Sequence, residues 1–518
     1  MDKKKNQNFL SGAAVLAVGG LFSKVLGLFF RLPLTNMLGD YGMSFYTKAY
    51  PLYNTFLSVS TIGLPTAVSK MVAERSVLGN DSGAKKVFKL ALRLMATIGA
   101  ASSALMFLGA RFFADVLYRS PGTYYSIIAL AAAPFIVALI SAYRGYFQGI
   151  QKMAVSSASQ IIDQLFRVGC GVGAAFLFLR IYGDVIYGAA GASFGATVGA
   201  FAALLFLVAA YFVDNRINRA ANLGVANENA MDVYKKLLTI ALPIAAGGLV
   251  TTVMSLINSI TIPSGLIIAG FTAENADVLF AKLENKAQAL LNVPFVLGTS
   301  LAASLVPSIS ASIARNERRM ATAKTTLAIK CSMLVSLPAA IGLSTLAGPL
   351  INLLFKDADP VDAALLQWLA YVVIFTLGMT TLQGILQGAG YYYKPIKNMI
   401  IGAVIKFGLN VVLVRMGNIN IYGAIISSTV ASAVIFLLNF YDVKKHIGIG
   451  SLAASVVKIL GCSVIMGMQA VFGYAFLAPK IGWRIAAIVV VGFCVVLYLG
   501  LVVITKAVTM EEIQEIRG

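Results

Sequence analysis

Apolar segments long enough to cross a lipid bilayer recur along this 518-residue chain from one end to the other. A transmembrane helix needs about 20 predominantly apolar residues, and the chain has room for about fourteen such helices. Apolar residues make up 59% of the sequence and charged residues 12%, about half the charged share of a soluble domain. The sequence therefore predicts an all-α polytopic membrane protein.

Each expected helix is a predominantly apolar run bounded by polar residues. The expected helices lie near residues 9–37, 46–72, 86–114, 123–143, 154–181, 186–213, 233–262, 278–313, 324–355, 361–388, 395–415, 420–441, 451–477 and 482–506. The first run follows Lys3, Lys4 and Lys5, as in a signal peptide, but continues to about Met37. We expect an uncleaved first transmembrane helix.

The formal net charge of +20 would suggest a nucleic-acid partner in a soluble protein. Here most Lys and Arg residues lie between apolar segments, in alternate loops. The opposite set of loops holds only Arg119, Arg180, Lys356, Arg415 and Lys480. Basic residues concentrate on the cytoplasmic side of membrane proteins, so we expect both termini in the cytoplasm and no nucleic-acid partner.

The two halves of the sequence resemble each other. Ile186-Tyr187-Gly188-Ala189 recurs as Ile421-Tyr422-Gly423-Ala424, and Arg167 has its counterpart in Lys406. An even number of helices in each repeat predicts two parallel, pseudo-symmetric six-helix lobes that meet at a central site, as in transporters. The expected parts are an N-terminal lobe (1–213), a cytoplasmic linker (214–232), a C-terminal lobe (233–446), and helices 13 and 14 with a cytoplasmic tail (447–518).

Ionisable residues within the expected spans are candidate functional residues, because a charge in the membrane is costly and usually faces a cavity or a partner. An excess of basic residues suits an anionic substrate such as a diphosphate. Asp163 and Arg167 form either an internal salt bridge or part of a substrate site, and Lys282 and Lys286 could instead snorkel to the outer membrane boundary. The predicted cavity residues are Lys24, Arg31, Asp163, Arg167, Lys282, Lys286 and Lys406.

Motifs for other functions are missing from the sequence. It has no Walker motif for ATP, and one histidine with scattered cysteines offers no metal site. Asp357-Ala358-Asp359 resembles the acidic tripeptide of some glycosyltransferases, but it lies in an expected external loop, where nucleotide sugars are not expected. We expect no catalytic residue, no cofactor and no enzymatic activity.

Four stretches carry a resemblance to a known family: Phe22-Ser23-Lys24-Val25-Leu26-Gly27, Gly63-Leu64-Pro65-Thr66-Ala67-Val68-Ser69-Lys70, Tyr143-Arg144-Gly145-Tyr146-Phe147-Gln148-Gly149, and Ser159-Gln160 through Asp163-Gln164 with Arg167. The sequence resembles the multidrug/oligosaccharidyl-lipid/polysaccharide (MOP) exporter superfamily, in the branch of stage V sporulation protein B and the MurJ-type lipid II flippases. The resemblance implies fourteen helices, a cationic cavity between two lobes, and a lipid-tail groove formed by the last two helices.

The family's charged residues carry over only in part. A family arginine matches Lys24, and a family arginine–aspartate pair falls on Phe30 and Arg31. The arginines of the second and eighth family helices fall near Thr55 and Ala289. The basic charge has therefore moved rather than vanished.

The resemblance implies a flippase that moves a polyprenyl-diphosphate-linked saccharide, with lipid II for peptidoglycan synthesis as the first hypothesis, from the inner to the outer leaflet of the bacterial cytoplasmic membrane. Its expected partners are this anionic lipid, membrane lipids, and a membrane potential or ion gradient as driving force; we expect a monomer. The alternatives are another lipid-linked glycan (capsule, teichoic acid or spore cortex), a cation-coupled multidrug antiporter, or a membrane scaffold that transports nothing.

Overall fold

The computed structural model describes residues 2–61, 63–217 and 229–507, and these residues form helices without any β-strand. Twelve helical stretches within them are long and apolar enough to cross a membrane. The protein is thus an all-α, polytopic membrane protein, as predicted. The count of fourteen spans stays a prediction. One of the twelve stretches, Phe30–Val77, has 48 residues, about twice the length that one crossing needs.

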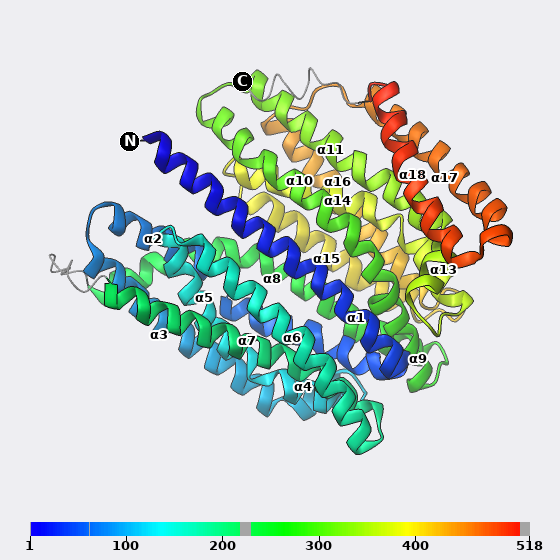
Figure 1. The fold of residues 1–518 in the computed structure, drawn as a ribbon, viewed down its shortest axis with the longest axis horizontal. Coiled ribbons are helices and arrows are strands. Elements are labelled where there is room, and N and C mark those ends of the chain that lie inside the picture. The colour runs from blue at the N-terminus through cyan, green and yellow to red at the C-terminus, as the bar shows by residue number, and fades with distance from the viewer. Residues whose placement is uncertain (1, 62, 218–228, 508–518) are drawn as a thin grey trace. The chain divides into compact units, whose positions relative to one another are not determined.

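The chain divides into two compact units, residues 1–264 and 265–518. The elements of the first unit are α1 (Asp2–Thr61), α2 (Leu64–Val77), α3 (Asp81–Leu108), the π-helix η1 (Phe112–Leu117), α4 (Thr123–Ala131), α5 (Ala133–Gly149), α6 (Met153–Tyr182), α7 (Val185–Ile217) and most of α8 (Ala230–Ile268). Figure 1 shows α6 and α7 as neighbours, and they pack closely along their length. The expected linker, 214–232, falls mostly on residues outside the described part.

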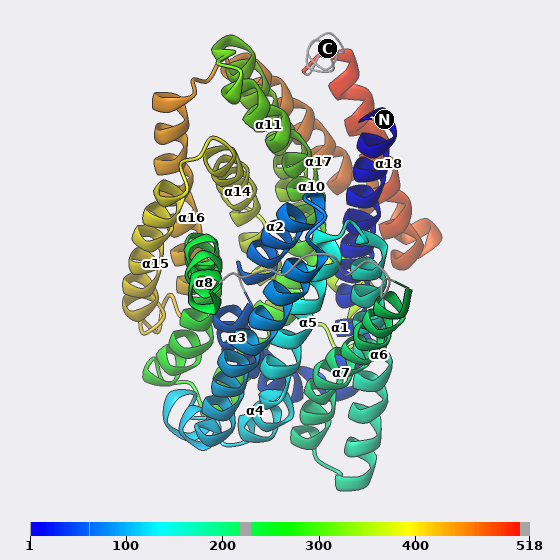
Figure 2. The ribbon, with the colours of Figure 1, turned by 90° about the vertical axis from the view of Figure 1, so that its left-hand side faces the viewer.

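The second unit contains α9 (Ala273–Ala281), the π-helix η2 (Lys282–Ala287), α10 (Gln288–Ala314), α11 (Arg318–Thr345), α12 (Ala347–Leu354), α13 (Pro360–Leu369), α14 (Val372–Gly388), α15 (Tyr393–Leu413), α16 (Tyr422–His446), α17 (Ala453–Ile481) and α18 (Trp483–Ile504). In Figure 2, α15 and α16 lie side by side. They are the counterparts of α6 and α7 in the sequence repeat. The last two helices, α17 and α18, pack on each other, and α17 packs on α11 (Figure 1).

The second expected helix, 46–72, is interrupted in the structure. Helix α1 is kinked at Gly39, where φ is 66°, between the first two expected helices. Its second part ends at Thr61, and α2 begins only at Leu64. Pro65 lies in the first turn of α2 and has no N–H to continue the preceding helix. Gly63 has a φ of 81°, and a Cβ built there would lie 2.3 Å from the carbonyl oxygen of Ala241. The break therefore needs glycine for both its backbone conformation and its close contact with α8.

Small residues bring α2 and α5 together. Gly145 and Gly149 are one turn apart on α5 and lie on the same helix face. A Cβ on Gly145 would lie 2.8 Å from the carbonyl oxygen of Pro65, and one on Gly149 would lie 2.7 Å from Cβ of Val72. Glycines spaced by four let two membrane helices approach closely. Two of the stretches that carry the family resemblance are thus packed against each other.

Candidate functional site

A polar cluster in the first unit is centred on Arg167 of α6. Its Nη2 lies 3.1 Å from the carboxylate of Asp163, one turn earlier on the same helix. Its Nη1 donates a 2.6 Å hydrogen bond to the hydroxyl of Tyr50 on α1. The side chains of Arg167 and Asp163 are 16% and 17% exposed. Of the two alternatives for this pair, the internal salt bridge is present, and Tyr50 on another helix accepts a further hydrogen bond from Arg167.

Tyr50 is the central ring of an aromatic row on α1. Its ring centroid lies 4.9 Å from that of Tyr46 and 5.4 Å from that of Tyr53. Arg31 and Arg167 both interact electrostatically with Tyr46. Residues at positions 46, 50 and 53 share one helix face, and this spacing was visible in the sequence although the prediction omitted these tyrosines. The row brings the predicted residues Arg31 and Arg167 to the same region of the first unit.

A second arginine belongs to this cluster. Arg144 lies inside α5, not in a loop, and its Nε donates a 2.8 Å hydrogen bond to Oγ of Ser159 on α6. Asp163 attracts Arg144 and Arg167, and the two arginines repel each other. Nη2 of Arg144 and Nε of Arg167 are buried and have no hydrogen-bond partner among the described residues. Two guanidinium groups thus share one carboxylate and retain donors for an anion.

The N-terminal part of α1 carries the remaining predicted cations of this unit. Arg31 is half-buried, and its carbonyl oxygen accepts a 2.8 Å hydrogen bond from Oγ1 of Thr35. The side chain of Lys24 lies outside the described residues. We call the set Arg31, Tyr50, Arg144, Asp163 and Arg167 the arginine cluster.

The repeat counterpart of Arg167 in the second unit is Lys406, on α15. Its side chain is 8% exposed, and its ammonium group makes no hydrogen bond or ion pair with a described residue. It interacts electrostatically with Glu284 of η2. A buried, weakly compensated ammonium group in a membrane-spanning helix is the kind of group that faces a cavity or an anionic ligand.

Lys282 and Lys286 are already paired with carboxylates. Nζ of Lys286 lies 3.0 Å from the carboxylate of Asp362, and these side chains are only 2% and 0% exposed. Lys282 forms an ion pair with Asp359. Both lysine side chains are buried, whereas Asp359, the partner of Lys282, is 44% exposed. Their role in substrate binding stays a prediction.

The two aspartates also organise the start of α13. The carboxylate of Asp359 accepts a hydrogen bond from the Asp362 N–H at 3.1 Å, and the carboxylate of Asp362 accepts one from the Asp359 N–H at 3.0 Å. This reciprocal arrangement is a capping box. Burial opposes ionisation of Asp359, but the hydrogen bond and charge of Lys282 hold its pKa below the ordinary value. Asp359, the second aspartate of the Asp357-Ala358-Asp359 tripeptide, thus caps α13 and pairs with Lys282.

No group of three or more metal-binding side chains occurs within the described residues. The four cysteines, Cys170, Cys331, Cys462 and Cys494, are all free. The arrangement offers positively charged groups that can bind an anion, in helices that cross the membrane.

Comparison with known proteins identifies the family. The chain matches the family model described as polysaccharide biosynthesis protein over residues 9–313, more than half of its length. It belongs to this family. The MatE model also matches, over residues 286–412. The family is part of the MOP exporter superfamily, whose matched members are transporters and flippases rather than enzymes.

Relatives match this polysaccharide biosynthesis protein along nearly its whole length. Lipid II flippase MurJ of Bacillus subtilis is 28% identical, over 96% of this chain and 95% of the relative. Stage V sporulation protein B of the same organism is 25% identical, over 98% of each chain. The solved structure of lipid II flippase MurJ in an inward closed conformation superposes with a TM-score of 0.70 at 13% identity, over 95% of this chain and 98% of that one. The polytopic fold is therefore shared.

Proposed function

We propose that this protein is a flippase that moves a polyprenyl-diphosphate-linked saccharide, lipid II in the first instance, from the inner to the outer leaflet by alternating access. The observation that carries the proposal is the arginine cluster. Arg144 and Arg167 share Asp163, so the cluster keeps excess positive charge and buried donors within the first unit. Guanidinium groups bind phosphate oxygens through paired hydrogen bonds.

The relatives support the same class of substrate. One relative is named a lipid II flippase and covers nearly the whole chain. With both termini in the cytoplasm, as the loop charges predict, the anionic head group moves outward along the membrane potential. An inside-negative potential favours this movement by about 2.3 kcal/mol per charge per 100 mV. Lys406 supplies a corresponding buried cation in the second unit.

The experiment is rescue of a bacterial strain depleted of its own lipid II flippases. Lipid II that has reached the outer leaflet is measured after expression of the native chain, Arg167→Gln or Arg180→Gln. Arg180 is an exposed residue near the end of the same helix and controls for loss of one charge. We expect rescue by the native chain and by Arg180→Gln but not by Arg167→Gln. No rescue at normal expression would refute lipid II as the substrate, and outward movement of another lipid-linked glycan would identify the alternative.

A cation-coupled drug antiporter is the second candidate, because the MatE model matches residues 286–412. Such a site favours acidic residues, which bind Na⁺, H⁺ or a cationic drug. In the arginine cluster two arginines, Arg144 and Arg167, share one aspartate, which favours an anionic substrate. Drug resistance conferred by expression of the chain, without outward lipid II, would support the antiporter instead.

A further inference from the structure

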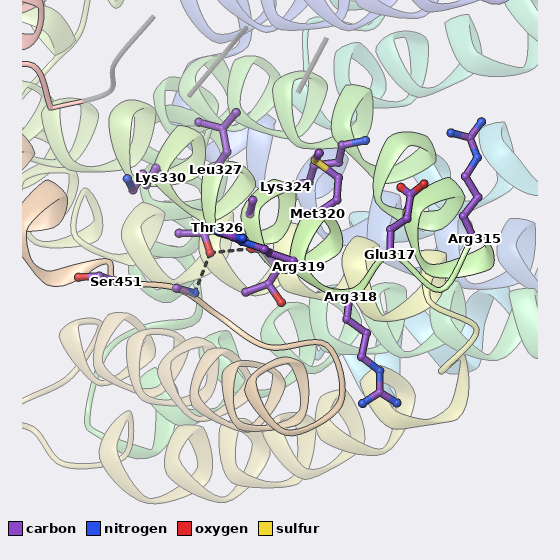
Figure 3. Close-up of a pocket in the computed structure, with 13 residues that line it drawn as sticks. Arg315, Glu317, Arg318, Arg319, Met320, Lys324, Thr326, Leu327, Lys330 and Ser451 are labelled. Carbon is purple, nitrogen blue, oxygen red and sulfur yellow. Dashed lines mark hydrogen bonds between the residues drawn. The ribbon is translucent and has the colours of Figure 1, made fainter. Parts of the chain in front are cut away.

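The second unit has a cationic site of its own, formed by residues other than Lys406. The turn between α10 and α11, the first part of α11 and the loop before α17 enclose a cavity of about 1190 Å³ (Figure 3). Five basic side chains and one carboxylate contribute to its lining: Arg315, Arg318, Arg319, Lys324, Lys330 and Glu317. The cavity is larger than a single phosphate needs and strongly favours an anion.

The arginines of this cavity are available for a ligand. Arg315, Arg318 and Arg319 are exposed, and none of them makes an ion pair with a described residue. Figure 3 shows Arg315 and Arg318 pointing to opposite sides of the turn between α10 and α11. The positive charge is therefore distributed around this turn. Lys324 donates a 3.1 Å hydrogen bond to Oγ of Ser312, which holds this fourth cation in place.

Hydrogen bonds fix the opposite wall of the cavity. Oγ1 of Thr322 on α11 donates to the carbonyl oxygen of Ile447 at 3.0 Å, and the N–H of Gly450 donates to Oγ1 of Thr326 at 2.8 Å. These bonds join α11 to the loop between α16 and α17, so the cavity has two walls that are tied together. It is a built pocket rather than a chance grouping of surface arginines.

The lining continues from the end of a membrane span into the span itself. Helix α11 is a candidate span from Arg318 to Thr345. Arg319, Leu327 and Lys330 lie on one face, and eleven residues of helix correspond to about 16 Å. Leu327 and Lys330 are buried, whereas Arg319 is exposed. The site therefore joins a basic opening to a deeper, partly apolar wall.

We propose that this cavity binds the phosphate head group of an anionic phospholipid from the surrounding leaflet. Basic pockets at the cytoplasmic ends of membrane helices suit phospholipid head groups, and the loop charges predict that this turn is cytoplasmic. A soluble phosphate would need only the exposed arginines. The apolar side chains of Met320 and Leu327 in the same lining favour a ligand that also has a hydrocarbon part.

The test measures phospholipid bound to the purified full-length protein by native mass spectrometry and by titration with vesicles. The vesicles contain neutral phosphatidylcholine alone, or with phosphatidylglycerol or cardiolipin. The test variant, Arg315→Gln/Arg318→Gln/Arg319→Gln, is compared with Lys397→Gln/Lys444→Gln/Lys445→Gln. The control removes the same number of exposed charges from the same unit without touching the cavity lining.

We expect the native protein and the control to bind anionic lipid and the test variant to bind it at least tenfold more weakly. Only the test variant removes guanidinium groups that line the cavity, and loss of one hydrogen bond to a charged group costs about tenfold or more in affinity. Equal loss in both variants, or no loss in the test variant, would overturn the proposal. Inorganic phosphate or pyrophosphate that displaces the lipid at equal concentration would also overturn it, in favour of a soluble anion. If the triple variant fails to fold, Arg319→Gln alone must show the weakened binding.

Discussion

Removal of the Lys286 ammonium group should strongly destabilise the second unit. Lys286 Nζ and the Asp362 carboxylate are 3.0 Å apart and almost fully buried. At an effective dielectric constant of about 20, the attraction at this distance is about 5.5 kcal/mol. Lys286→Gln would leave the Asp362 carboxylate buried without its cation, and breaking a buried pair in this way costs about 3–5 kcal/mol.

The matched control is Lys394→Gln. Lys394 pairs with Asp442 at 3.4 Å in the same unit, with side chains that are 33% and 18% exposed. More exposed pairs contribute about 0–1 kcal/mol. Unfolding in mild detergent titrated with sodium dodecyl sulfate gives the free energy of unfolding of each variant. A loss for Lys286→Gln no larger than that for Lys394→Gln would show that the buried Lys286–Asp362 pair does not stabilise the second unit more than an exposed pair does. The double variant Lys286→Met/Asp362→Asn should recover part of the lost stability, because no unpaired charge remains.

Three further predictions concern packing, the hydrogen bond to Arg167, and pH. Gly149→Ala should destabilise the protein by about 1–3 kcal/mol through overpacking against Val72. The control is Gly173→Ala, because a Cβ at Gly173 would have nothing within 4 Å. This variant should be neutral or slightly stabilising in the same unfolding assay. Tyr50→Phe should reduce lipid transport, because Arg167 loses its 2.6 Å acceptor. The free energy of unfolding should fall by about 1.5–3 kcal/mol, the range for a hydrogen bond to a charged group. Since the pKa of Asp359 is lowered in the folded state, its stabilising contribution is present above the ordinary value of 3.8 and lost as pH falls through the lower folded value. Unfolding between pH 6 and pH 3 should therefore be less pH-dependent in Asp359→Asn.

Local sequence patterns predicted the features that depend on near neighbours. The apolar runs predicted the membrane helices. The four-residue spacing of Asp163 and Arg167 left a salt bridge and a substrate site as alternatives; the salt bridge is present, and the substrate site stays a prediction. The break at Gly63 was not predicted. Membrane helices tolerate proline, so Pro65 alone did not indicate an end; the close approach of Ala241 from α8 is a tertiary contact.

Contacts between distant residues could not be predicted from one sequence. Asp362 lies 76 residues from Lys286, and no local pattern joins them. Tyr50 lies 117 residues from Arg167. The spacing of Tyr46, Tyr50 and Tyr53 predicts a shared face but not the residue that the face contacts. The sequence could therefore indicate a cationic site. Only the structure shows that residues from α1, α5 and α6 form it.

Transport of lipid II by the purified protein is the measurement that decides whether this chain is a lipid II flippase. The protein is reconstituted into vesicles that contain lipid II with a labelled head group, and the label that becomes accessible on the opposite side is measured over time. We expect movement with the native protein and with Arg180→Gln, and movement at the level of protein-free vesicles with Arg167→Gln. Native protein that is folded but moves lipid II no faster than empty vesicles would contradict lipid II as the substrate. Equal movement with Arg167→Gln would contradict the role of the arginine cluster.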